Sequence, residues 1–155
     1  MNGGRMNIRR TSLMILTAIF TVFLSVANAA GQSEDKPVYT SYKGIGIGTP
    51  AAEARAKLGD PRDKSDSQDF FVFSDNENAQ VIYGPDKCVS VISATYLGNL
   101  DAAPTAKAVF GTDAEAKPDG AIFKLVRYPK AGYWVSYHRT GGADPMIIVT
   151  VQKIP

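Results

Sequence analysis

The sequence predicts an α+β fold made of two tandem units, each a short helix followed by an antiparallel β-meander, with the helices packed on one face of the sheet. Short alternating apolar runs are separated by tight turns, which favours antiparallel strands because parallel strands need longer crossovers. A brief helical pattern ending in glycine precedes each group of strands. The order of elements also recurs at a spacing of about 52 residues, which is typical of a duplicated unit. We therefore expect one continuous or nearly continuous sheet.

Residues 1–30 are predicted to be a signal peptide. Arg5, Arg9 and Arg10 precede an apolar run, and Ala27-Asn28-Ala29 supplies the small-x-small pattern of a cleavage site. The run is shorter than the roughly 20 apolar residues that cross a bilayer. No cysteine follows it to carry a lipid. We expect a periplasmic or secreted protein without a membrane anchor in its mature form.

The rest of the chain is predicted to be one compact domain behind a flexible leader at residues 31–38. The first helix-meander unit takes residues 39–98 and the second takes residues 99–155. The full chain has 17 Lys and Arg against 15 Asp and Glu, but three of the arginines belong to the signal peptide. The mature chain is thus nearly neutral, and we expect it not to bind nucleic acid.

The first unit opens with the stretch GIGIGTPAAEARAKLGDP at residues 44–61. Thr49 is predicted as the helix N-cap and Pro50 as the first helical residue, while Gly59 ends the helix. A dinucleotide-binding loop is excluded because the third glycine falls one residue early, and a P-loop because no Gly-Lys-Ser/Thr follows. Beyond the helix, residues 69–75, 79–84 and 88–96 are predicted strands.

The second unit repeats this order. Residues 103–111 contain a proline, an alanine-rich helical run and a Phe-Gly ending, which correspond to Leu58-Gly59 of the first unit. Three predicted strands follow, at residues 121–128, 132–139 and 145–154.

The entry and exit of the first helix carry a family resemblance. Ile45-Gly46-Ile47-Gly48-Thr49, a short helix, Leu58-Gly59-Asp60-Pro61 and a meander together resemble the exported domain of the SmpA/OmlA (BamE-like) proteins and of the β-lactamase inhibitory protein. That resemblance implies the helix-plus-meander fold, and the tandem form of the inhibitory protein matches the duplication. It further implies either an inhibitor-like or an envelope-associated role. The chain departs from the inhibitory protein's disulfides, because it has one cysteine, and from the lipid-bearing cysteine of the BamE-like members.

Few residues suggest catalysis or metal binding. His138 is the only histidine and lies in a strand pattern with no motif that supplies a nucleophile and an orienting acid. Cys88 is the only cysteine and is expected to be a small buried side chain in a strand, although an intermolecular bond stays open. We expect no cofactor, no metal and no enzymatic activity.

Four aspartates recur at every third position of the loop after the first helix: Asp60, Asp63, Asp66 and Asp69. Calcium loops place their ligands at alternate positions around a glycine, and this loop does not. We therefore predict a solvated loop.

An aromatic and cationic cluster gives the main hypothesis about function. Strand alternation puts Trp134 and His138 on one face and Tyr133, Val135 and Tyr137 on the other. The second set is the more apolar, so we predict that Trp134 and His138 lie on the open face of the sheet. Aromatic residues beside arginine are typical of protein-binding surfaces.

The predicted partner-binding residues are Trp134, His138, Tyr128 and Arg139. The predicted function is an exported, non-enzymatic module that binds another envelope or secreted protein through an exposed sheet face. One alternative is a small secreted hydrolase or ligand carrier with a pocket near His138, and another is an envelope assembly or structural factor.

Overall fold

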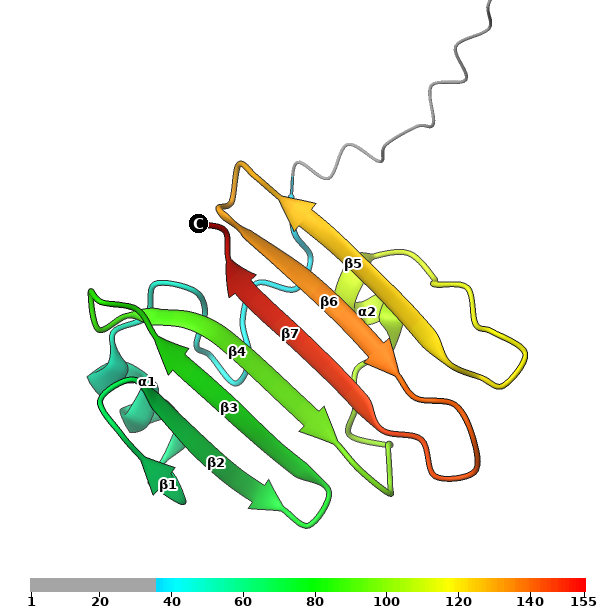
Figure 1. The fold of residues 1–155 in the computed structure, drawn as a ribbon, viewed down its shortest axis with the longest axis horizontal. Helices are drawn as coiled ribbons and strands as arrows, with labels where there is room; N and C mark the ends of the chain where they lie inside the picture. Colours follow the sequence, from blue (N-terminus) through cyan, green and yellow to red (C-terminus); the bar gives the residue numbers. More distant parts are fainter. Residues whose placement is uncertain (1–35) are drawn as a thin grey trace, which may run out of the picture. The chain divides into compact units, whose positions relative to one another are not determined.

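A computed structural model describes residues 36–155. The predicted signal peptide and most of the predicted leader lie outside the described residues. The described part has α+β architecture, with an antiparallel sheet of seven strands and two short helices (Figure 1). The predicted fold class is confirmed at this level, and so is the expectation of one continuous sheet.

The strands run β1-β2-β3-β4-β7-β6-β5 across the sheet. Their bounds are β1 Asp63–Lys64, β2 Gln68–Ser74, β3 Glu77–Tyr83, β4 Val89–Tyr96, β5 Ile122–Tyr128, β6 Tyr133–Arg139 and β7 Ile147–Lys153. Two meanders, β2-β3-β4 and β5-β6-β7, join where β4 pairs with β7. In that central pairing, Ser93 lies opposite Thr150 and their hydroxyl oxygens are 3.1 Å apart.

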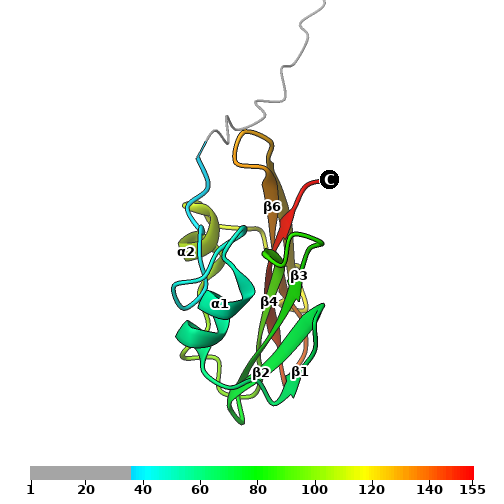
Figure 2. The ribbon, with the colours of Figure 1, turned by 90° about the vertical axis from the view of Figure 1, so that its left-hand side faces the viewer.

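Both helices lie on the same side of the sheet (Figure 2). Helix α1 spans Ala51–Leu58, one residue shorter than predicted because it begins after Pro50, and it turns Ala54 and Leu58 inward at positions four apart on one helix face. The predicted N-cap at Thr49 is wrong. Pro50 takes the cap position, and its ring offers no acceptor for a side-chain bond, while the Thr49 hydroxyl instead accepts the Gly46 N–H at 3.1 Å.

Helix α2 spans Ala106–Phe110 and has the cap that α1 lacks. The Thr105 hydroxyl accepts the N–H of Ala108 at 3.1 Å. Gly111 then closes the helix in the left-handed conformation, with φ of 75°, and donates its N–H to the carbonyl of Lys107.

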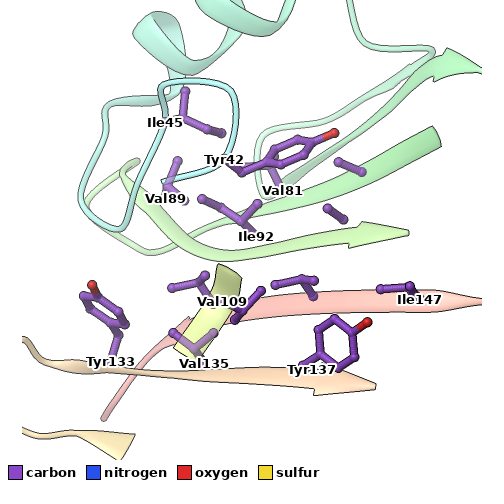
Figure 3. Close-up of a cluster of buried hydrophobic side chains, with 14 of the residues drawn as sticks. Tyr42, Ile45, Val81, Val89, Ile92, Val109, Tyr133, Val135, Tyr137 and Ile147 are labelled. Carbon is purple, nitrogen blue, oxygen red and sulfur yellow. The ribbon is translucent and has the colours of Figure 1, made fainter. Parts of the chain in front are cut away.

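One hydrophobic core joins the helices to the sheet (Figure 3). Alternate strand residues enter it from both meanders, including Val81, Ile92, Val135 and Val149. Val109 of α2 is fully buried in the same cluster. Both meanders therefore bury one face of the sheet in this shared core.

Cys88 departs from its prediction. It precedes β4, forms a β-bridge with Pro50 and is half-buried, so it is neither a strand residue nor fully enclosed. Its backbone pairs with the segment that leads into α1, and its thiol donates to the Asp86 carbonyl at 3.5 Å.

Candidate functional site

Strand alternation places the predicted binding residues of β6 on two opposite faces. Tyr133, Val135 and Tyr137 are buried on the helix side, while Trp134 is half-buried and His138 is exposed on the open side. The predicted orientation of this strand is therefore confirmed. It follows from the greater apolar surface of the Tyr133 row.

The register of the sheet brings residues of β5 and β6 together on the open side. Trp134 lies opposite Arg127, and His138 lies opposite Phe123. The rings of Phe123 and His138 meet edge to face, with their centroids 6.1 Å apart. The central position of the pair of strands is filled by Leu125 opposite Ser136. We call these six residues the β5–β6 face.

Two members of the β5–β6 face are large apolar side chains in contact with water. Phe123 is 65% exposed and Leu125 is 44% exposed. Sequence analysis missed both residues, because it predicted a strand at residues 121–128 without assigning its two faces. The signal was nevertheless present, since Phe123 and Leu125 alternate with Val126 and Tyr128, and only one of these sets can enter the core.

The other two predicted binding residues lie on the helix side and are corrected. Tyr128 is 3% exposed and packs against Tyr133, with the ring centroids 6.0 Å apart. Arg139 lies opposite Ile122 and lines a cavity beside α2. Both corrections have one cause: Tyr128 and Arg139 alternate in phase with the buried rows of β5 and β6.

A hollow of about 490 Å³ adjoins the β5–β6 face. It is bounded by Phe123 and by the loop between α2 and β5, which contributes Glu115, Lys117 and Pro118. The hollow and the exposed strand residues thus form one surface with both apolar and charged parts.

The polar contacts of His138 give no support for catalysis. Its neighbours across the sheet are Phe123 and Ile148, and its imidazole has no hydrogen bond or ion pair to another described residue. Within residues 36–155, no three His, Cys, Asp or Glu side chains gather as a metal site would require. A nucleophile and base with an orienting acid are not assembled around this histidine.

A buried ionic cluster occurs elsewhere, beside α1. The guanidinium of Arg55 donates to Asp69 at 2.7 and 3.0 Å, and the Tyr83 hydroxyl donates to Asp69 at 2.7 Å. Asp69 is 1% exposed, which corrects its prediction as part of a solvated loop. Burial favours a higher pKa for Asp69, but the bonds from Arg55 and Tyr83 outweigh it and hold the pKa below its ordinary value. Satisfied in this way, the cluster ties α1 to the sheet.

Comparisons with protein-family profiles, with curated proteins and with solved structures give no match. The resemblance to the SmpA/OmlA proteins and the β-lactamase inhibitory protein therefore stays a prediction. Among the described residues, neither helix has the length and apolar character needed to cross a bilayer.

Proposed function

We propose that this protein is an exported, non-enzymatic module that binds another envelope or secreted protein on its β5–β6 face. The exposure of Phe123 and Leu125 beside Trp134 carries the proposal. Removing such apolar surface from water is the main favourable contribution to protein association.

The chemistry of the face also describes its partner. Arg127 and His138 lie beside the aromatic residues, and the six residues of the face include no acid. Arginine and tryptophan are enriched among the residues that dominate binding energy. A complementary partner would present an apolar side chain toward the hollow beside Phe123 and carboxylates toward Arg127.

The tandem interpretation belongs to the same proposal. Each meander follows a short helix, and in both helices the closing glycine bonds to an equivalent position: Gly59 to Arg55 and Gly111 to Lys107. These parallels support two related helix-meander units, at residues 39–98 and 99–155, with their helices packed on one face of the sheet. The resemblance to the tandem inhibitory protein is consistent with an inhibitor-like role for the β5–β6 face, which lies on the side of the sheet without helices.

The signal-peptide pattern of residues 1–30 supports the proposed export, which the N-terminus of the native protein can test. We expect the mature chain to begin at Ala30 or Gly31 and to occur outside the cytoplasm. N-terminal sequencing of the protein from the native host would check the cleavage site. An intact Met1 on the native protein would contradict export by cleavage.

Affinity capture from the envelope fraction tests the binding face. The wild-type chain, Phe123→Ser, Trp134→Ala and Val72→Ser would serve as baits. Val72 is the matched control because it lies on the open face of β2 and is 43% exposed. We expect Phe123→Ser and Trp134→Ala to lower recovery of a partner about tenfold or more, and Val72→Ser to retain it.

Hydrogen exchange on the recovered complex would map where the partner binds. We expect amide protection on binding to be confined to β5, β6 and the loop before β5. Equal recovery by all four baits would place the interaction away from the β5–β6 face and overturn the proposal.

A further inference from the structure

A cavity of about 330 Å³ is lined by residues of α2 and by residues of β5, β6 and β7 that alternate with the β5–β6 face. Arg139 at the end of β6 lines it together with Lys107 of α2. Ile122, Ile147 and Leu100 supply apolar walls. The cavity thus combines two cations with an apolar lining, and its volume is in the range of small-molecule sites.

Arg139 is the unusual residue of this cavity. Its Nε is buried and has no hydrogen-bond partner among the described residues. The ion pairs of residues 36–155 do not include its guanidinium. Tyr137 lines the same cavity, and burial raises its pKa while the positive charge of Arg139 opposes that rise. A buried N–H donor without an acceptor is costly, which makes an incoming acceptor favourable.

The corresponding place in the first meander shows how such a charge is otherwise neutralised. Tyr83 and Arg139 are each the last residue of the middle strand of their meander. Arg55 and Lys107 also correspond, because the backbone carbonyl of each accepts the N–H of the glycine that closes its helix. In the first meander, buried Asp69 bonds to both Arg55 and Tyr83. Around the second cavity, no carboxylate among the described residues takes that role.

The acid that lines the cavity with these cations is Asp113. Its carboxylate is 3.9 Å from the Lys107 ammonium, and its side chain is 83% exposed. An exposed pair at this distance is weak. Asp113 therefore leaves the buried Arg139 Nε without an acceptor and competes only for Lys107.

We propose that this cavity binds a small organic carboxylate, with the carboxylate on Arg139 and Lys107 and an apolar body against Ile122 and Ile147. Guanidinium and carboxylate match in geometry, and their charge-assisted bonds are stronger than neutral ones. The apolar walls favour an organic carboxylate over an inorganic anion, because an inorganic anion has no apolar surface to bury against them.

Titration of the ¹⁵N-labelled mature chain with three probes tests the site. Hexanoate has both the charge and the apolar body, hexanamide lacks the charge, and inorganic phosphate lacks the body. We expect saturable shifts of the Arg139 Nε–H and of the Ile122 and Ile147 amides with hexanoate only. Equal shifts with hexanamide, or saturation by phosphate alone, would overturn the assignment.

Two variants assign the effect to the charges. Arg139→Gln should weaken hexanoate binding about tenfold or more, which is about 1.4 kcal/mol. Asp113→Asn removes the competing carboxylate at an exposed position, so it should strengthen binding without changing the melting temperature. If Arg139→Gln lowers the melting temperature, its weaker binding could reflect misfolding, and the Asp113→Asn variant then tests the anion site. Unchanged or weaker hexanoate binding by Asp113→Asn would contradict an anion site.

Discussion

At the residue scale, Asp69 shows how one buried charge fastens a helix to a sheet. Its carboxylate receives bonds from Arg55 on α1 and from Tyr83 on β3. Asp69→Asn should lower the free energy of unfolding by about 2 kcal/mol, since it leaves Arg55 without its counter-charge. This loss is small for a broken buried ion pair, because the Arg55 side chain is 27% exposed and water can partly solvate its charge.

Denaturant unfolding at pH 7 would measure this loss. Asp60→Asn is the matched control, because Asp60 is exposed and forms no ion pair within the described residues. An equal effect of the two substitutions would contradict a special role for Asp69.

The same carboxylate predicts a pH dependence of stability. Its folded-state pKa lies below its ordinary value, so its contribution is complete above about pH 4, where the unfolded carboxyl ionises. Stability should fall as the pH drops from there through the folded-state pKa, because protonation then removes the charge that Arg55 neutralises.

Melting temperatures measured from pH 7 down to pH 2 would show this acid loss. Asp69→Asn should show a smaller loss than the wild type over the same range. Parallel curves for the two proteins would attribute the acid sensitivity to other carboxylates.

At the element scale, the two helices differ in how they begin. Thr105 caps α2 through a side-chain bond to the Ala108 N–H, whereas Thr49 bonds to Gly46 and leaves α1 without such a cap. Thr105→Ala should cost about 1 kcal/mol of stability, because a short helix loses one of its few satisfied N–H groups.

Thr105→Ser is the conservative control, since serine keeps the hydroxyl acceptor. Chemical denaturation of both variants would test the cap, and we expect the serine variant to remain close to the wild type. A loss of similar size in both would indicate packing of the threonine methyl group instead.

Most elements could be predicted because each carries a local signal. The bounds of α1 follow from alanine-rich sequence between Pro50 and Gly59, and six of the strands follow from alternation between turns. Strand β1 was missed because two residues hold no periodic pattern. Thr49 was misassigned because its hydroxyl has two acceptable donors nearby, and their geometry depends on the folded loop.

The candidate site was less predictable than the strands that form it. Alternation was enough to place Trp134 and His138 on the open side. Tyr128 and Arg139 were misplaced because they were grouped with Trp134 by proximity in the sequence, although Arg139 alternates in phase with the buried row of β6 and Tyr128 with that of β5.

At the scale of the whole molecule, the pairing of β4 with β7 makes two meanders into one folding unit. Six residue pairs span this junction, and both of its strands bury alternate residues in the shared core. Residues 36–155 also belong to one compact unit. Disruption of either meander should therefore destabilise the other, as cooperative unfolding of a single domain requires.

Trp134 is the only tryptophan and lies in the second meander, so its fluorescence reports on a site remote from the first. Phe71 of β2 is 1% exposed, and Phe71→Ala should destabilise the protein by about 3 kcal/mol through the cavity it leaves. We expect the denaturant midpoint measured by Trp134 fluorescence to fall together with the midpoint measured by far-ultraviolet circular dichroism.

Val72→Ala is the control on the same strand. Because the Val72 side chain is 43% exposed, its truncation should leave both midpoints nearly unchanged. If Phe71→Ala lowers the dichroism midpoint while the fluorescence midpoint stays fixed, the meanders unfold separately and the β4–β7 junction does not couple them.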